Sequence, residues 1–331
     1  MNIKYNIQLK EFNSFKTKAS AKLFCEPKTV EDLSEVIKAY PNEKKLVLGA
    51  GYNLLFTKDF DGLIIKPAML DINIVNESDE YIEIEAGAGI EWDKLVEESV
   101  AKELSGLENL SLIPSSVGAS PIQNIGAYGS EVKDTITKVK AVDNKSGEFV
   151  EFTNKECGFG YRDSIFKQTY RYIITSVSFR LRKSFNYKEK YIDVSRELKN
   201  TPTPTLSEVR DAIIRIRTRK LPPGNLPNAG SFFKNPILTM HQKEELLRID
   251  ADVPIFNYGE KKFKTSAAYL IEKTGYKGKR KGMVGTYVNH ALVIVNYGTE
   301  NGKDIVDFAG DIQSVVLKEF GLKLEPEVWI F

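Results

Sequence analysis

The apolar residues of this chain recur at helical spacing in some stretches and at alternate positions in others. After Thr29, apolar residues at 30, 33, 36 and 37 fall on one helix face, and Thr29 with Asp32 resembles a capping box. Residues 46–50, LVLGA, form an apolar run that predicts a buried strand. In residues 71–89 isoleucine alternates with other residues, which predicts a two-stranded hairpin. The N-terminal part of the chain therefore mixes helices and strands.

The same patterns divide the middle of the chain. An amphipathic helix beginning near Trp92 and the short strands around it predict an α+β unit over residues 68–200. The segment TPTPT, residues 201–205, is typical of a linker, and the apolar spacing after it predicts a helix. The KLPPG sequence at residues 220–224 breaks this pattern. We therefore expect the last domain to begin there.

The C-terminal part alternates between helices and strands. Ser266 can cap a helix, ALVIVNY predicts a buried strand, and residues 305–320 predict a helix. The final segment, LKLEPEVWIF, alternates apolar and polar residues. This alternation predicts an edge strand with Lys323, Glu325 and Glu327 on one face.

Composition narrows the possible functions. The 331 residues are 42% hydrophobic and 11% aromatic, which suits a protein of two or three domains with real cores. The formal net charge of +2 argues against a surface built for nucleic acid or another polyanion. No apolar stretch approaches membrane-spanning length, so no membrane partner is expected. A small ligand is the expected partner.

The cysteines and histidines exclude two classes of site. Cys25 and Cys157 are isolated, which argues against a disulfide framework and favours a reducing cytoplasm. His241 and His290 are the only histidines. A His-rich metal site is therefore not expected.

The most distinctive stretch is LIPSSVGASPIQNIGAYGSEV, residues 112–132. Its small residues let the backbone approach a flat or anionic ligand, with backbone N–H groups available as donors. Gln123 and Asn124 add amides that can hydrogen-bond a polar ring edge. A set of ordinary tight turns is the alternative. A second glycine pair, Gly49 and Gly51, follows the first predicted strand but lacks the third glycine of a dinucleotide fingerprint.

Two further motifs carry candidate chemistry. In NAGSFFKNP, residues 228–236, small residues before Ser231 let its hydroxyl approach a ligand, although no partner is apparent that would make it a nucleophile. Ser231 suits a proton donor to a strongly basic intermediate, or a structural role. In GYRDSIFK, Arg162 is a permanent positive charge between aromatics, with a structural pair to Asp163 as the alternative.

Taken together, LGAGYNLLF, PIQNIGAYG, YRDSIF, KLPP before NAGSFFKNP, and LEPEV closely resemble the UDP-N-acetylenolpyruvoylglucosamine reductase family, in the family's order. The resemblance runs from about residue 9 to residue 328. An insert at residues 185–194 is similar to the one that type I members carry. The resemblance implies NADPH-dependent, FAD-mediated reduction of UDP-N-acetylglucosamine enolpyruvate to UDP-N-acetylmuramate. It also implies a role in peptidoglycan synthesis, and hence in cell shape and division, for a monomeric cytoplasmic enzyme.

The resemblance also implies a fold of class α+β. Two subdomains of the para-cresol methylhydroxylase type would bind FAD, and a C-terminal α+β domain would bind substrate. The expected ranges are 1–67, completed by the C-terminal strand 318–331, for the first subdomain and 68–200 for the second. A linker helix at 201–219 and a substrate domain at 220–317 follow.

Residues matching the family's motifs give the expected site. FAD would be held noncovalently by residues of the glycine-containing loops and one strand: Gly49, Ala50, Gly51, Tyr52, Asn53, Leu54, Pro114, Gly118, Ala119, Ile122, Gly126, Ala127, Tyr128 and Ile174. Arg162 and Glu327 match residues that stabilise an enolate, and Ser231 matches the serine that protonates C2. Glu327 would need a pKa raised by burial to donate a hydrogen bond. Glu325, on the same predicted face, is the alternative.

Tyr191, Lys220 and Asn235 match positions that hold the uridine diphosphate part of the substrate. His290 lies near another such position but equally suits a strand edge. No residue is expected to bind a metal.

The sequence departs from the family's pattern at several positions. Tyr52 replaces a serine, Ser115 a glycine and Trp329 an arginine, and residues 13–17 differ from the usual N-T-F-G-I. Two alternatives therefore stay open. One is a related flavin oxidase acting on another carbohydrate or alcohol, although such enzymes often attach flavin through His or Cys and these loops contain neither. The other is a non-catalytic flavin or nucleotide-sugar binding protein.

Overall fold

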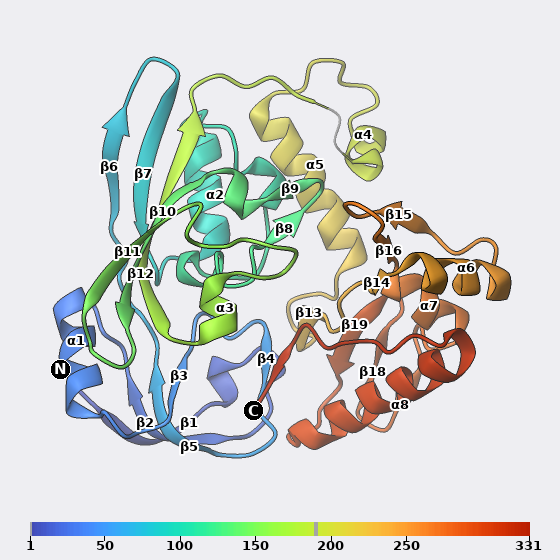
Figure 1. The fold of residues 1–331 in the computed structure, drawn as a ribbon, viewed down its shortest axis with the longest axis horizontal. Helices are drawn as coiled ribbons and strands as arrows, with labels where there is room; N and C mark the ends of the chain where they lie inside the picture. Colours follow the sequence, from blue (N-terminus) through green and yellow to red (C-terminus); the bar gives the residue numbers. More distant parts are fainter. Residues whose placement is uncertain (1, 189–190) are drawn as a thin grey trace. The chain divides into compact units, whose positions relative to one another are not determined.

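The computed structural model describes residues 2–188 and 191–331, which form two compact units (Figure 1). The first unit comprises Met1–Ile7, Ala21–Ala50 and Asp61–Arg217. The second comprises Gln8–Ser20, Gly51–Phe60 and Thr218–Phe331. The chain thus passes between the units several times. The domain ranges expected from the sequence stay predictions.

The first unit carries a four-stranded sheet with the order β1-β2-β5-β3. Its strands are β1 (Lys4–Gln8), β2 (Ser20–Cys25), β5 (Phe60–Ile65) and β3 (Lys45–Val47). The helix predicted after Thr29 is α1 (Val30–Ala39), whose Leu33, Val36 and Ile37 are buried. The Thr29 side chain caps it by accepting a hydrogen bond from the Asp32 N–H. The predicted strand at 46–50 is shorter than expected, since β3 ends at Val47.

A second, antiparallel sheet of the first unit has the order β11-β10-β12-β7-β6. Its strands are β11 (Phe149–Thr153), β10 (Ile136–Asp143), β12 (Tyr172–Arg182), β7 (Tyr81–Gly87) and β6 (Ile72–Glu77). The hairpin predicted at 71–89 is β6 with β7. The short strands β8 (Gly126–Ala127) and β9 (Ser130–Glu131) pair within the loop 112–132.

Helix α2 (Trp92–Ala101) packs on this second sheet. The Trp92 ring is fully buried and meets the edge of the Phe179 ring, with centroids 5.9 Å apart, and its Nε1–H donates to the Leu110 carbonyl. The other helices of this unit are α3 (Ile165–Thr169), α4 (Ile192–Glu197) and α5 (Leu206–Lys220), the last of which continues into the second unit. The helix predicted after the TPTPT linker is therefore confirmed.

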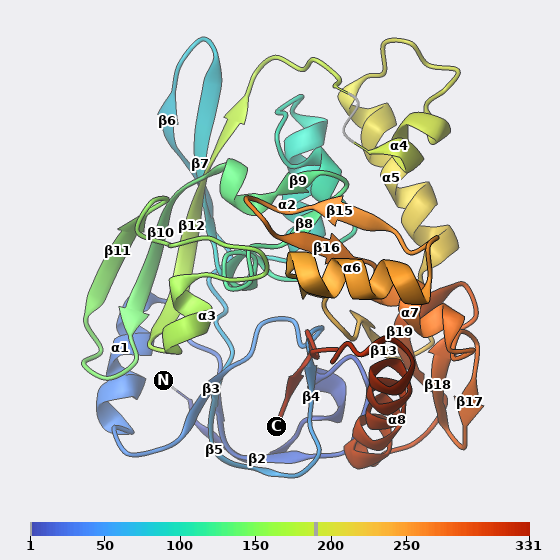
Figure 2. The same ribbon diagram turned by 45° about the vertical axis from the view of Figure 1, so that its right-hand side comes forward.

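The second unit is also mixed. One sheet has the order β13-β19-β18-β17, with β13 (Asn228–Ser231), β19 (His290–Asn296), β18 (Val284–Tyr287) and β17 (Arg280–Lys281). A smaller sheet joins β14 (Ile237–Leu238), β16 (Phe263–Thr265) and β15 (Ile255–Asn257). Helix α6 (Met240–Ile249) lies beside this small sheet (Figure 2). The remaining helices, α7 (Ala267–Lys273) and α8 (Gly302–Phe320), share the core with β19.

The predicted helix ends of the second unit are confirmed. The Ser266 side chain accepts a hydrogen bond from Tyr269 N–H at the start of α7, and α8 ends at Gly321, whose φ of 67° is left-handed. The predicted C-terminal strand is wrong in extent, because β20 comprises only Trp329–Ile330. It pairs in parallel with β4 (Leu54–Leu55).

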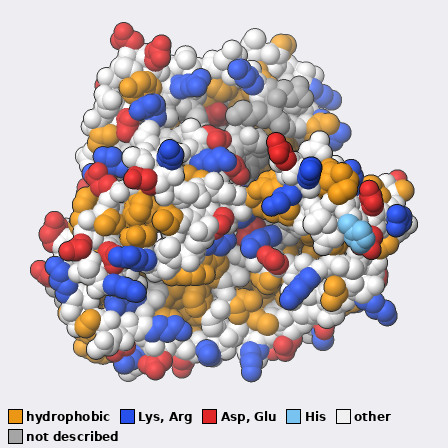
Figure 3. Space-filling view, viewed as in Figure 1, with side chains coloured by type: hydrophobic (Ala, Val, Ile, Leu, Met, Phe, Trp, Pro, Cys, Tyr) orange, Lys and Arg blue, Asp and Glu red, His pale blue; other side chains and the backbone are white. Residues whose placement is uncertain are grey.

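Positive and negative side chains are interspersed over the face drawn in Figure 3, in keeping with the net charge of +2. Within the described residues, none of the helices is both long enough and apolar enough to cross a membrane.

Candidate functional site

Two glycine-containing turns that the sequence singled out separately lie against each other in the first unit. A Cβ placed on Gly49 would come within 2.9 Å of Ser116 Oγ and 3.4 Å of the Ala119 Cβ. A Cβ on Gly118 would lie 2.6 Å from the Cβ of Ala88 and 3.1 Å from its Cα. A side chain larger than hydrogen would therefore collide with Ala88 at Gly118 and crowd the Ser116 side chain at Gly49. The packing fits a backbone-lined cradle for a flat or anionic cofactor.

The backbone donors of this cradle are partly used within the protein. Val117 N–H donates to the Ile90 carbonyl, Gly118 N–H to the Ala88 carbonyl and Ala119 N–H to the Ser116 carbonyl. The expectation that the loop's N–H groups are generally available is therefore wrong for these residues. Buried backbone groups need partners, and here the segment after β7 supplies two of them and the loop itself the third.

Arg162 lies beside the second half of the same loop. Its Nη2 donates to the Gly126 carbonyl at 2.8 Å and its Nη1 to the Asn124 carbonyl at 3.4 Å. The Arg162 backbone is left-handed, with φ of 53°, and its carbonyl accepts a hydrogen bond from Lys167 Nζ at 2.8 Å. The structure therefore brings the candidate cation to the glycine-rich loop.

Asp163 is oriented by other partners. Its carboxylate accepts hydrogen bonds from Ser164 N–H and from Gln168 Nε2. These contacts, together with the Arg162 bonds to loop carbonyls, disfavour the purely structural pair of Arg162 with Asp163 that the sequence left open.

Asn124 has a different role from the one expected. Its amide is fully buried and donates to Glu131 Oε2 at 3.1 Å and to the Gly160 carbonyl at 3.0 Å, while its Oδ1 accepts from Lys133 N–H. The amide thus ties the loop to the segment that precedes Arg162. The expectation that it meets a ligand's ring edge is wrong, because its hydrogen-bonding groups are engaged inside the protein.

The remaining candidates of the first unit lie in the same loop or in β12. Ile122 accepts a hydrogen bond from Ser164 Oγ at its carbonyl, and Ile174 is buried in β12. Ala127 lies in β8, and Tyr128 has a left-handed backbone with φ of 48°. Pro114 is exposed.

In the second unit, Ser231 and Glu327 lie on adjoining segments. Glu327 N–H donates to the carbonyl of Phe232, the residue after Ser231, at 2.8 Å. Ser231 ends β13 and pairs with Val293 of β19. Gly230, with φ of 68°, has no heavy atom within 4 Å of the position a Cβ would take. The structure therefore leaves space beside the serine, as the small residues before it predict.

The two candidate glutamates of this unit differ in their exposure and in their partners. The side chain of Glu325 is 71% exposed and pairs with Lys234, its Oε2 lying 3.4 Å from Nζ. Glu327 is half-buried and follows Pro326, which bridges to Phe233. The chain bends at Glu327 and Val328 instead of continuing as a strand, so the predicted strand is wrong in extent, while the shared face stays a prediction. Glu327 is the better candidate for chemistry in a water-poor site.

The turn around Gly51 contacts the segment that contains Glu327. Gly51 has φ of 78°, and a Cβ there would lie 2.1 Å from the Phe12 carbonyl oxygen. Asn53 Nδ2 donates to the Glu327 carbonyl at 3.3 Å, and Trp329 N–H donates to the Asn53 carbonyl. A candidate cofactor residue and a candidate catalytic residue are thus joined within the second unit. Ala50 and Tyr52 flank Gly51, and Leu54 pairs with Trp329.

The candidate substrate residues differ in their surroundings. Tyr191 precedes α4, is 43% exposed and meets the edge of the Tyr128 ring, with centroids 5.4 Å apart. Lys220 is exposed at the end of α5.

Asn235 Oδ1 accepts a hydrogen bond from Ala267 N–H at the start of α7, which leaves its amide nitrogen as the candidate donor. His290 begins β19, and its Nδ1 accepts a hydrogen bond from Leu292 N–H.

Sequence reasoning missed a group of side chains around Leu112. Asp93 of α2 accepts hydrogen bonds from Arg210 Nη1 at 2.7 Å, Arg210 Nη2 at 2.9 Å and the Leu112 N–H. Burial alone would raise the pKa of Asp93, but the Arg210 and Leu112 bonds hold it below its ordinary value. Arg217 Nε donates to the Leu112 carbonyl. No local motif signals these contacts, because the partners are far apart in sequence.

Two family models match the chain. One, described as UDP-N-acetylenolpyruvoylglucosamine reductase, C-terminal domain, matches residues 222–331, and one described as FAD binding domain matches residues 21–153. The UDP-N-acetylenolpyruvoylglucosamine reductase of Flavobacterium johnsoniae is 43% identical over 335 residues, which cover 99% of each chain. That of Bdellovibrio bacteriovorus is 41% identical over 334 residues, again 99% of each.

A solved structure matches the fold. The UDP-N-acetylenolpyruvylglucosamine reductase of Thermus caldophilus superposes with a TM-score of 0.71 at 24% identity, covering 100% of this chain and 99% of that one. With the FAD-binding match, this likeness confirms the predicted α+β fold class of an FAD-binding part followed by a C-terminal part.

Proposed function

Because the chain belongs to the UDP-N-acetylenolpyruvoylglucosamine reductase family, we propose that it reduces the enolpyruvyl ether of UDP-N-acetylglucosamine to UDP-N-acetylmuramate, with FAD as its redox cofactor. The similarity to the Flavobacterium johnsoniae reductase extends over 99% of each chain. The product is a precursor of peptidoglycan. NADPH is the proposed reductant, and the protein is proposed to act as a cytoplasmic monomer.

The close packing of glycines supports FAD as the cofactor. A Cβ on Gly118 would collide with Ala88 and one on Gly49 would crowd Ser116, so glycine lets these turns pack closely, and their backbone is proposed to line the cradle. Gly126 and Tyr128 continue it beside Arg162. FAD, when bound, supplies a hydride to the substrate's C3. The chain's own residues bind and orient the reactants, exclude water and handle charge and protons.

Arg162 and Glu327 are proposed to stabilise the negative charge that develops on C2 and its carboxylate. A guanidinium is charged at every working pH, and a fixed charge acts most strongly where water is excluded. The Arg162 backbone is held by Lys167 and its side chain by two loop carbonyls, so little reorganisation is needed when charge develops. Glu327 is proposed to act on the same enolate as a protonated carboxyl.

Ser231 is proposed to donate the proton that C2 receives. A serine hydroxyl is a weak acid in water, but a carbanion-like neighbour is basic enough to take its proton. Space beside Gly230 and the hydrogen bond from Glu327 N–H to the Phe232 carbonyl support this role, since they leave room near the serine and join its segment to that of Glu327. Tyr191, Lys220 and Asn235 are proposed to hold the uridine diphosphate part.

The observation that carries this proposal is full-length similarity to the reductases combined with the link between the Ser231 and Glu327 segments. It is tested by purifying the protein, measuring noncovalent flavin absorbance, and following NADPH oxidation with and without UDP-N-acetylglucosamine enolpyruvate. We expect oxidation to depend on that substrate. Oxidation at the same rate without it would contradict the proposal and favour an oxidase.

A further inference from the structure

Arg217, near the end of α5, contacts two distant points of the glycine-rich loop. Its Nε donates to the Leu112 carbonyl over 3.1 Å, and its side chain hydrogen-bonds the Tyr128 hydroxyl. Leu112 begins the stretch 112–132, and Tyr128 lies near its other end. A planar guanidinium has donors pointing in different directions, so one arginine can hold both points at once.

Both contacted residues have a backbone that is unfavourable without support. The φ angles are 56° for Leu112 and 48° for Tyr128, in the left-handed region that L-residues with side chains rarely adopt. Such conformations persist only where surrounding contacts impose them. The hydrogen bonds of Arg217 are contacts of this kind, at the backbone of one residue and the side chain of the other.

Helix α5 holds Leu112 through a second arginine as well. Arg210 makes a two-pronged ion pair with Asp93, and Asp93 in turn accepts the Leu112 N–H. Arg210 and Arg217 are seven positions apart, about two helical turns, so they lie along one side of α5. Helix α5 therefore holds Leu112 in two ways. Arg210 acts indirectly, through Asp93, on the Leu112 N–H, and Arg217 binds the Leu112 carbonyl directly.

Packing directs Tyr128 toward this helix. Its ring meets the edge of Tyr191 and packs against a cluster from α4, the residue after it, and α5: Val194, Leu198, Val209, Ala212, Ile213 and Ile216. Desolvation lowers the pKa of the Arg217 guanidinium, opposed by its interactions with Tyr128 and Asp93. A partly buried guanidinium is stabilised by partners within the protein. The tyrosine hydroxyl and the Leu112 carbonyl provide them.

We propose that Arg217 is a positioning residue that clamps the loop between Leu112 and Tyr128 in the shape that receives FAD. This inference rests on the proposed function, since it takes the loop as part of the cofactor site. Between the two clamped points lie most of the first unit's predicted FAD contacts: Pro114, Gly118, Ala119, Ile122, Gly126 and Ala127. Arg217 acts on the cofactor only through this backbone.

The test is hydrogen exchange of the loop amides in the FAD-free protein, with FAD affinity measured separately. In Arg217→Gln, amides of residues 112–128 should exchange about tenfold faster or more, because hydrogen bonds from a charged group are lost at both points. Exchange in β10 and β12 should not change, which distinguishes a released loop from general destabilisation. The dissociation constant for FAD should rise by a similar factor.

Tyr128→Phe provides a second, milder variant that keeps the ring packing. It removes only the hydroxyl, so exchange should accelerate near Tyr128 and stay unchanged near Leu112. This variant carries the test if Arg217→Gln does not fold.

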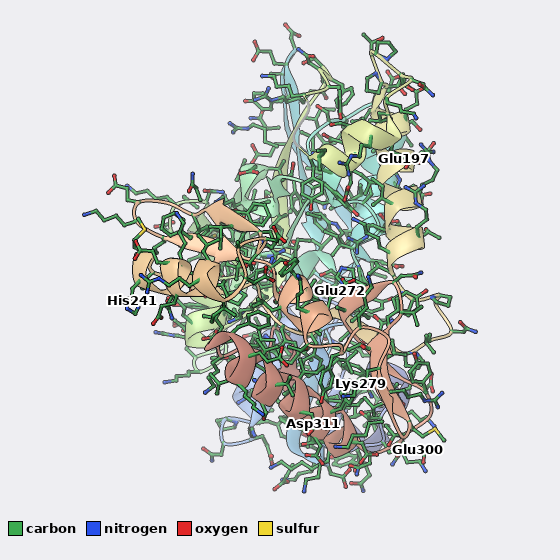
Figure 4. All side chains as sticks on the ribbon, turned by 90° about the vertical axis from the view of Figure 1, so that its right-hand side faces the viewer. Glu197, His241, Glu272, Lys279, Glu300 and Asp311 are labelled. Carbon is green, nitrogen blue, oxygen red and sulfur yellow. The ribbon has the colours of Figure 1, made fainter. Side chains whose placement is uncertain are left out.

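The matched control is Arg215→Gln on the same helix. Arg215 is half-exposed and pairs with Glu197 at 2.8 Å; Figure 4 labels Glu197 on α4, next to α5. In this variant the loop amides should exchange at the same rate as in the original protein, and the affinity for FAD should be unchanged. If the loop amides of both Arg217→Gln and Tyr128→Phe exchanged hydrogen at the same rates as in Arg215→Gln, the proposal that Arg217 clamps the loop would be overturned. Absence of FAD binding in the original protein would contradict the proposed function, while the exchange rates would still decide the clamp.

Discussion

Single residues decide which side chains of the motifs remain available for chemistry. Both Asn124 and Glu325 were candidates, from the sequence, for contact with a ligand. The structure engages the Asn124 amide with Glu131 and Gly160, and exposes Glu325 beside Lys234. The motifs alone could not distinguish Glu325 from Glu327, because the distinction comes from partners distant in sequence, such as Lys234 beside Glu325 and Phe233 beside Pro326.

Gly118 tests the cradle at the residue scale. In Gly118→Ala the new Cβ would meet Ala88 at 2.6 Å, and the contacted atoms include rigid backbone. We expect a loss of about 1–3 kcal/mol of unfolding free energy from overpacking, together with weaker FAD binding. Chemical denaturation and flavin titration measure the two effects. Gly224→Ala is the control, since a Cβ there meets nothing within 4 Å; equal behaviour of both variants would contradict the close packing.

Ser231 tests the proposed proton donor. Ser231→Ala removes the hydroxyl but leaves the proposed flavin contacts in place. We expect NADPH to reduce the bound flavin normally, while its reoxidation by the enolpyruvyl substrate slows by about two orders of magnitude or more. Stopped-flow absorbance follows the two half-reactions separately. Unchanged reoxidation would remove Ser231 from this role.

At the scale of elements, the helices were predicted well because their signals are local. Capping residues and apolar spacing located α1, α7 and α8, including the Gly321 end of α8. The C-terminal strand was overpredicted, because alternation alone does not tell whether a partner strand continues alongside. Only the two residues of β20 find one in β4. The Asp93–Arg210 contact between α2 and α5 left no pattern in the sequence at all.

The Asp93–Arg210 pair predicts a specific dependence of stability on pH. The folded-state pKa of Asp93 is lowered, so the stability it contributes is present above the unfolded pKa of about 3.9 and is lost as the pH falls below it. Asp93→Asn should therefore cost about 2–3 kcal/mol at neutral pH, somewhat less than a fully buried pair, since the Asp93 side chain is 22% exposed.

The same variant should differ little from the original protein at acid pH. Denaturant unfolding at several pH values measures the gap between them. Glu97→Gln, which changes an exposed carboxyl on the same helix, should show a small difference at every pH. A gap for Asp93→Asn that stays constant from neutral to acid pH would show that the ion pair does not provide the stability.

At the scale of the whole molecule, the sequence predicted the class of fold and the family, but not the path of the chain. Residues 8–20 and 51–60 belong with the C-terminal part in the second unit. Local spacing cannot reveal this arrangement, since it depends on long-range contacts such as the pairing of Leu54 with Trp329. The motifs predicted the candidate site residues, and the structure showed the contacts that hold these residues in place.

The central claim is that this protein transfers a hydride and a proton to the enolpyruvyl double bond. The most direct test is to reduce the flavin-loaded protein without oxygen, mix it with UDP-N-acetylglucosamine enolpyruvate alone, and identify the product by mass spectrometry. Our account predicts rapid return of the oxidised flavin spectrum with stoichiometric formation of UDP-N-acetylmuramate. A flavin that stays reduced while the enolpyruvyl ether is recovered unchanged would contradict it.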